Sequence, residues 1–191
     1  AFVAHGYLRG GAGVAQLDGA LYAFLPKGEG PGAREYLYEL NEDGGKGRIV
    51  CGKAGCAHEE QGTLLDPCHA YSHTVTGLMA ADGALFAGSR NGAVGVTRFD
   101  PKGGPPETVL TSEKEIACFL VWDGDIYYAQ QDQPFPAGEL TQGSGYRLMK
   151  RPLDAPDAPA EAIYAREGRG YIGCCQQIGG ALYLTEFALG D

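Results

Sequence analysis

Basic residues are scarce in this sequence. Lys and Arg number 15 against 24 Asp and Glu, which gives a formal net charge of −9. A surface that binds nucleic acid or anionic lipid needs clustered positive charge, so both classes of partner are excluded. No apolar run is long enough to cross a bilayer, and we expect no membrane insertion by this chain. Residues 1–6 have neither a charged nor a sustained apolar region, so no signal peptide is predicted.

The residues that are abundant point to short strands joined by tight turns. Hydrophobic residues make up 44% of the chain and charged residues 20%, a balance typical of a globular protein. Glycine occurs 31 times, and the 11 tyrosines outnumber the 7 phenylalanines. Glycine favours turns and tyrosine favours strands, so the composition predicts an all-β protein.

One short pattern recurs four times along the chain. A two-residue turn that contains glycine is followed by a run of aliphatic and aromatic residues, and the turns are Asp18-Gly19, Asp82-Gly83, Asp123-Gly124 and Gly179-Gly180. Asp-Gly between two apolar runs is a strong signal for a β-hairpin. The turns at 82 and 123 are 41 positions apart, which is the length of a propeller blade.

The sequence therefore predicts an all-β fold, a β-propeller of four-stranded antiparallel blades with about three and a half blades present. A β-sandwich is the less favoured alternative. The predicted parts are blade 1 at about 7–50, an insertion at 51–73, blade 2 at about 74–112, blade 3 at about 115–166 and a partial blade 4 at about 170–191. A half blade leaves bare strand edges, so we expect a fragment of a larger ring of about six to eight blades, or a half-ring completed by a partner chain through open sheet edges.

Four small residues lie five positions before the four turns: Gly13, Gly77, Cys118 and Cys174. We expect them at equivalent sites on the innermost strands, where small buried side chains fit. Strict alternation along a strand places Cys175 on the opposite face from Cys174. A disulfide between Cys118 and Cys174 is not expected, because equivalent sites in splayed blades seldom come within bridging range.

The insertion holds most of the metal-ligating residues of the chain. Its pattern is C-x4-C-x-H-x9-C-H, and Cys51, Cys56, His58 and Cys68 form a Cys₃His set that could close a tetrahedral structural zinc site. The alternative is a disulfide among Cys51, Cys56 and Cys68. His58 and the odd number of cysteines favour the metal, and both interpretations stay open. A nucleophilic cysteine activated by His58 is a third, weaker interpretation.

These residues resemble a pattern in uncharacterised, mostly Gram-positive bacterial proteins with a TolB-like β-propeller fold, many of them surface lipoproteins. The matching positions are Cys51, Cys56, His58, Cys68, Ala70 and Tyr71, whereas Gly55 stands where an acidic residue is usual and the usual proline is absent. The resemblance implies an extracellular or cell-surface location and no established activity.

The loops suggest where a partner binds. Strand order places the insertion and the segment 130–145 on the same face of the blades, opposite the short Asp-Gly turns. The predicted ligand-binding residues are Gln131, Phe135, Gln142, His69 and His73. They suit a polar ligand such as a glycan or a peptide, or a protein partner. We therefore predict a non-catalytic binding module. The alternative is a glycan-acting hydrolase or lyase with its site at the central channel.

Overall fold

A computed structural model describes residues 13–27, 34–58, 68–72, 75–91, 93–131, 145–168 and 170–188. These residues form strands, turns and loops, and none of them is helical. Accordingly, no helix in the described ranges could span a membrane. The chain divides into two compact units, Ala1–Thr108 and Val109–Asp191, and the boundary falls within one strand, β9.

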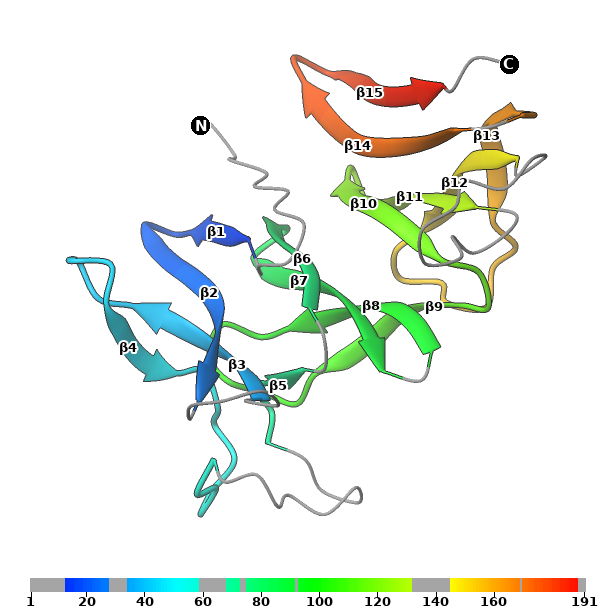
Figure 1. Cartoon of the computed structure of the whole chain (residues 1–191). Helices are drawn as coiled ribbons and strands as arrows, with labels where there is room; N and C mark the ends of the chain where they lie inside the picture. Colours follow the sequence, from blue (N-terminus) through cyan, green and yellow to red (C-terminus); the bar gives the residue numbers. More distant parts are fainter. Residues whose placement is uncertain are drawn as a thin grey trace. The chain divides into compact units, whose positions relative to one another are not determined.

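The N-terminal unit contains two antiparallel sheets (Figure 1). In the first sheet the strands follow chain order, and β5 pairs with β3; its strands are β1 (Val14–Leu17), β2 (Ala20–Lys27), β3 (Arg34–Leu40), β4 (Lys46–Ile49) and β5 (Tyr71–Ser72). The second sheet also follows chain order, with β6 (Val75–Ala81), β7 (Ala84–Asn91), β8 (Ala93–Phe99) and β9 (Glu107–Ser112).

The other two sheets hold the remaining strands. One has four strands in chain order, β10 (Ile116–Trp122), β11 (Asp125–Gln131), β12 (Tyr146–Pro152) and β13 (Glu161–Arg166). The last is a hairpin of β14 (Gly170–Ile178) and β15 (Ala181–Ala188). The predicted four-stranded antiparallel sheets are confirmed for β6–β9 and β10–β13, and the first sheet has the same four strands with β5 as a fifth. The two strands predicted after residue 170 are present. The ring arrangement of a propeller stays a prediction.

The four glycine turns adopt the geometry that their sequence favours. Both central residues have positive φ in each turn, as in Asp123 at 55° followed by Gly124 at 74°. Two successive positive φ values define a type I′ turn, whose twist matches that of the flanking strands. Because the same turn starts the second strand of every sheet, the repeat seen in the sequence is also a structural repeat.

A β-bulge recurs at one place in the repeat, and the sequence pattern did not predict it. The pairing register shifts between Val75 and Gly77, between Ile116 and Cys118, and between Ile172 and Cys174. In each strand the extra residue lies six positions before the glycine turn. A bulge breaks the alternation of side chains between the two faces of a strand, so residues on either side of it change face relative to a regular strand.

The core of the N-terminal unit lies between its two sheets. Buried side chains from both sheets meet there, and the rings of Phe24 on β2 and Phe99 on β8 pack edge to face with their centroids 5.4 Å apart. Leu37 on β3 is fully buried, and Cys68 and Ala70 of the insertion belong to the same core. The end of the insertion is therefore part of the folded body of this unit.

Replacing Gly124 tests the turn geometry. Gly124→Ala should lower the free energy of unfolding by about 1–2 kcal/mol, because a side chain with a Cβ is strained in the left-handed region. Space is not limiting, since an added Cβ would meet nothing within 4 Å. Gly124→Asn should cost less, because Asn tolerates this conformation. Urea denaturation followed by Trp122 fluorescence measures both, and equal losses would contradict a backbone cause.

Candidate metal centre

The two ends of the Cys/His insertion are held by the backbone of one residue, Leu37. The Val50 N–H donates to the Leu37 carbonyl at 2.9 Å, and the Leu37 N–H donates to the Ala70 carbonyl at 2.8 Å. One edge of β3 is thus shared by β4 and β5, which the insertion joins. Because Cys51 follows Val50 and Cys68 precedes Ala70 by two positions, these bonds bring the two cysteines to the same place.

Two tight turns position the other ligand atoms. In the first, the Cys56 N–H donates to the Lys53 carbonyl at 3.2 Å, and Gly55 has a φ of 71° that favours glycine. In the second, the Tyr71 N–H donates to the Cys68 carbonyl at 3.0 Å. Short turns next to the cysteines point the thiols inward over few residues, as a metal-binding loop requires.

The predicted Cys₃His set comes together in the structure. The ligand atoms of Cys51, Cys56, His58 and Cys68 all lie within 4.8 Å of one another. Nδ1 of His58 lies 3.3 Å from Sγ of Cys68. Zn–S bonds of about 2.3 Å in a tetrahedron place two sulfur atoms roughly 3.8 Å apart, so four atoms grouped this closely fit around one zinc ion.

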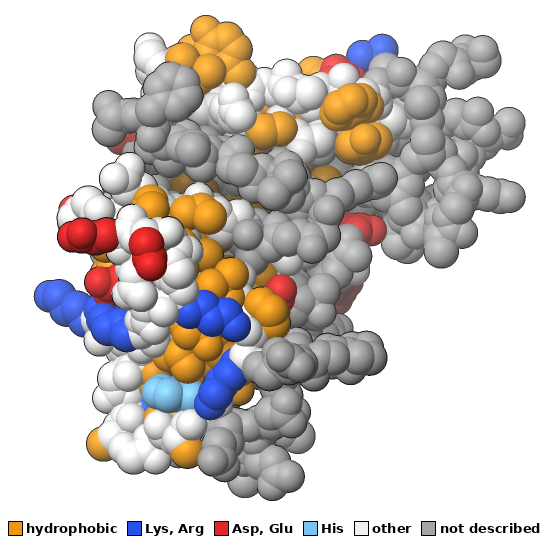
Figure 2. Space-filling model, turned by 60° about the vertical axis from the view of Figure 1, so that its left-hand side comes forward, with side chains coloured by type: hydrophobic (Ala, Val, Ile, Leu, Met, Phe, Trp, Pro, Cys, Tyr) orange, Lys and Arg blue, Asp and Glu red, His pale blue; other side chains and the backbone are white. Residues whose placement is uncertain are grey.

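His58 is held in an uncommon backbone conformation. Its φ is 51°, a value rare for a residue with a side chain, and such strain persists only where neighbouring groups fix it. Lys27 on β2 supplies one such contact, since Nζ donates to the His58 carbonyl at 2.6 Å. Burial lowers the pKa of the His58 imidazole, and the Lys27 charge lowers it further, so the neutral ring that can ligate a metal is favoured. Figure 2 shows Lys and Arg side chains next to hydrophobic side chains on one face of the molecule.

Backbone N–H groups donate hydrogen bonds to the sulfur atoms of Cys51 and Cys68. Burial raises the pKa of the Cys51 thiol, but hydrogen bonds from the Lys53 and His69 N–H groups, together with the neighbouring thiols, bring it below its usual value. Burial raises the pKa of Cys68 to about 12, although the Ala70 N–H acts in the opposite direction. Three thiols this close cannot all ionise without a positive charge among them, whereas a bound cation would stabilise all three thiolates.

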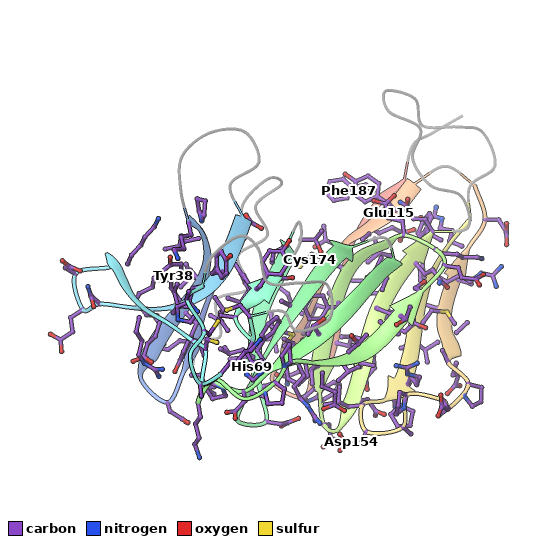
Figure 3. All side chains as sticks on the ribbon, turned by 90° about the horizontal axis from the view of Figure 1, so that it is seen from below. Tyr38, His69, Glu115, Asp154, Cys174 and Phe187 are labelled. Atoms are coloured by element: carbon purple, nitrogen blue, oxygen red, sulfur yellow. The ribbon has the colours of Figure 1, made fainter. Side chains whose placement is uncertain are left out.

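The loop between β8 and β9 supports the cluster from outside. The carbonyl of Gly103 accepts hydrogen bonds from the Gly52 N–H at 2.7 Å and from Nδ1 of His69 at 3.0 Å. One ring nitrogen of His69, Nδ1, fixes the loop, and the predicted role of His69 in ligand binding stays a prediction. Figure 3 shows His69 close to the sulfur atoms drawn in yellow. His69 therefore positions the cluster through its backbone and its ring.

Of the other predicted ligand-binding residues, the structure describes only Gln131. Gln131 ends β11 and is only 3% exposed, and neither polar atom of its side chain has a hydrogen-bond partner in the part of the chain that the structure describes. Phe135, Gln142 and His73 lie outside the described residues. A surface formed jointly by these residues stays a prediction.

A second polar cluster was missed by sequence reasoning. The carboxylate of Glu186 on β15 accepts hydrogen bonds from the hydroxyls of Tyr146 and Tyr164 and from Nη1 of Arg166. Tyr146 is buried, and burial followed by the bond to Glu186 raises its pKa to about 12. These residues come from three strands that are distant in sequence, so only tertiary structure brings them together. Because three donors from β12 and β13 bind one carboxylate of β15, the cluster holds the β14–β15 hairpin against these two strands.

Comparison with known proteins identifies no family. No protein-family model matches the chain, and no curated protein matches it. Among solved structures, the crystal structure of the computationally designed Ika4 protein is similar with a TM-score of 0.49 and 10% identity, over 94% of this chain and 90% of that chain. A likeness at this level carries no argument about the fold or the function.

Gly103 offers a test of the support given to the cluster. A Cβ on Gly103 would lie 2.4 Å from the Gly52 nitrogen and 2.8 Å from the Cys51 carbonyl carbon, so Gly103→Ala must displace Cys51. We expect faster alkylation of Cys51 and Cys56, measured by mass spectrometry. Gly44→Ala is the matched control, because Gly44 has a similar positive φ of 79° with nothing within 4 Å. Equal alkylation in both variants would contradict this role.

Glu186 should make the stability of the protein sensitive to acid. The hydrogen bond from Tyr146, followed by those from Tyr164 and the charge of Arg166, holds the pKa of Glu186 below its usual value. Its stabilising effect is therefore complete above the pKa of the unfolded chain and is lost as pH falls through the folded-state pKa. Glu186→Gln should flatten the acid side of the stability profile in urea titrations. Glu161→Gln, an exposed site on β13, should leave that profile unchanged.

Proposed function

We propose that this chain is a non-catalytic binding module of propeller type whose Cys/His insertion is held by a structural zinc ion. The observation that carries the proposal is the convergence of Cys51, Cys56, His58 and Cys68 within 4.8 Å. Four protein ligands fill a tetrahedral site and leave no open position for a water or a substrate, which is the arrangement of structural zinc. A catalytic zinc would need one of these positions free.

The zinc ion would hold the insertion against the first sheet. Only Cys68 and Ala70 of the described part of the insertion belong to the buried core, whereas Cys51 and Cys56 are half-buried at its edge. A loop with so little apolar core gains stability mainly from the metal that closes it. The backbone amides near Cys51 lower the pKa of its thiol, which favours the thiolate that a metal binds.

A disulfide in the insertion is the competing arrangement. It would use two of the three cysteines and leave one thiol and His58 without a role. The structure contains no disulfide among its six cysteines, and Nδ1 of His58 lies 3.3 Å from Sγ of Cys68. The inclusion of the imidazole in the cluster supports the metal.

The proposed partner is a polar ligand, such as a glycan or a peptide, or a protein, and the proposed location is extracellular or at the cell surface. The location is supported by the sequence resemblance to surface propeller proteins alone. A non-catalytic role is supported by two carboxylates that already have partners. Glu186 accepts hydrogen bonds from three donors, and Glu107 forms an ion pair with Arg98. The alternative, a glycan-acting hydrolase or lyase, requires acids or bases left available at a channel.

The strand edge of β15 is a second place for a partner. Within the described residues β15 pairs only with β14, whereas the second strand of each other sheet also pairs with a third. Ile178, Tyr183 and Phe187 of this hairpin are 57%, 54% and 48% exposed. A second copy that pairs β15 with β15 about a two-fold axis would complete a four-stranded antiparallel sheet, the size of the β6–β9 and β10–β13 sheets.

Metal analysis tests the zinc site. Protein purified without chelator should contain one zinc per chain, and Cys56→Ser and His58→Ala should each lose it. Removal of the metal should cost about 4 kcal/mol of stability at a free zinc concentration a thousand times the Kd. Cys174→Ser is the matched control, since it makes the same chemical change outside the cluster.

A thiol count separates zinc from a disulfide. After denaturation with a chelator and no reductant, the zinc protein should show all six cysteines as free thiols. A count lower by two, with the missing thiols mapped to Cys51, Cys56 or Cys68, would overturn the zinc assignment.

Sedimentation velocity tests the β15 edge. Association of the chain should increase with concentration, and Tyr183→Lys should abolish it by placing a charge at the edge. Leu21→Lys is the control, because Leu21 is 40% exposed on β2, a strand already paired on both sides. A chain that stays monomeric at every concentration would contradict pairing between copies.

A further inference from the structure

A second group of cysteines lies in the C-terminal unit, separate from the Cys/His cluster. Sγ of Cys118 on β10 lies 3.7 Å from Sγ of Cys175 on β14. Cys118 is 1% exposed and Cys175 is 4% exposed, whereas the adjacent Cys174 is half-buried. Two buried thiols 57 positions apart in sequence are therefore in contact where β14 packs on β10.

The β-bulge in β14 explains why the contact involves Cys175. In a regular strand Ile172 and Cys174 would share one face, and Cys175 would point away. The extra residue, Gly173, shifts the register between Ile172 and Cys174, so that Ile172 and Cys175 are the buried pair instead. Cys174 and Cys175 follow each other beyond the bulge and lie on opposite faces, as the alternation predicted, and Cys175 is the one that contacts Cys118.

Glycine at the bulge is required by close packing. A Cβ on Gly173 would lie 2.7 Å from the ring of Phe187, which stacks on Tyr171 with centroids 4.9 Å apart. The bulge and its aromatic cover hold β14 in this register, and the register keeps Cys175 against Cys118.

The surroundings of this pair differ from those of the Cys/His cluster. Sγ of Cys118 donates to the Ile172 carbonyl at 3.8 Å, and burial together with the neighbouring thiol raises the pKa of Cys175. No imidazole or carboxylate joins these thiols in a metal-ligating group of the described residues. Two thiols alone lack a ligand set for a metal, and the reaction open to two thiols in contact is oxidation to a disulfide.

We propose that Cys118 and Cys175 are a disulfide-forming pair that locks the β14–β15 hairpin to the β10–β13 sheet when the protein meets a low-molecular-weight disulfide. One cysteine, as thiolate, attacks a sulfur of that disulfide, forms a mixed disulfide and releases one small thiol. The other cysteine loses its proton and attacks the protein sulfur of the mixed disulfide, which releases the second small thiol. Two protein thiols are oxidised, and one small disulfide is reduced to two thiols.

The link would constrain a long segment. A disulfide stabilises mainly by restricting the unfolded chain, and the effect grows with the length of the closed loop. The loop from 118 to 175 contains β11, β12 and β13, so the oxidised C-terminal unit should resist unfolding more than the reduced unit. The proposal does not depend on the zinc site, because its residues and its readout are separate.

Peptide mapping of the full chain tests the pair. The chain is incubated with oxidised glutathione, alkylated, digested with trypsin without reductant and analysed by mass spectrometry. Trypsin cleaves after Lys114, Arg147 and Arg169, which places Cys118 in the peptide 115–147 and both other cysteines in 170–191. The expected product is these two peptides joined and lighter by two hydrogens, together with a raised thermal midpoint.

Three variants decide which sulfur atoms react. Cys174→Ala should keep the cross-linked peptide and the rise in midpoint, whereas Cys175→Ala and Cys118→Ala should each lose both. A cross-link that persists in Cys175→Ala would assign the bond to Cys174 and overturn the proposal, as would its absence from the oxidised unmodified chain. If one variant fails to fold, the other still decides, because each removes one partner of the same bond.

Discussion

The local structure around the Cys/His cluster depends on the backbone of Leu37. Its N–H and its carbonyl bind the two ends of the insertion, so a loop of many residues begins and ends at one point on the edge of β3. Leu37 is fully buried, and its bonds are protected from water. Hydrogen bonds of the sheet, which need no metal, therefore offset the entropy lost when the loop is closed. The three thiols and the imidazole then need only short turns to meet.

The two sulfur clusters show how surroundings decide the chemistry of one residue type. In the insertion, backbone N–H groups point at the sulfur atoms of Cys51 and Cys68, and an imidazole completes the set. Cys118 and Cys175 lie on neighbouring strands, and their thiols contact each other and a carbonyl group. The imidazole beside three thiols favours metal binding in the first cluster, and the contact between two thiols favours disulfide formation in the second.

The repeated unit includes a turn and a bulge of defined geometry as well as the order of the strands. The same type I′ turn starts the second strand of every sheet, and the same bulge interrupts β6, β10 and β14. The turn is visible in the sequence because glycine at positive φ leaves a compositional signal. The bulge leaves none, since Thr76, Ala117 and Gly173 have no common side-chain feature. A bulge that the fold repeats three times could therefore not be predicted from the sequence pattern.

The sequence by itself determined the strands other than β5, their order within the sheets, the glycine turns and the identity of the Cys₃His residues. These features depend mainly on residues that are close in the sequence, whereas β5 is a strand because it pairs with β3. Tertiary structure decided what depends on strand packing: that Gly103 and His69 brace the cluster, that Tyr146, Tyr164 and Arg166 converge on Glu186, and that Cys175 meets Cys118. Contacts between residues far apart in the chain are fixed by register and by bulges, and a one-residue shift in register exchanges the faces of a strand.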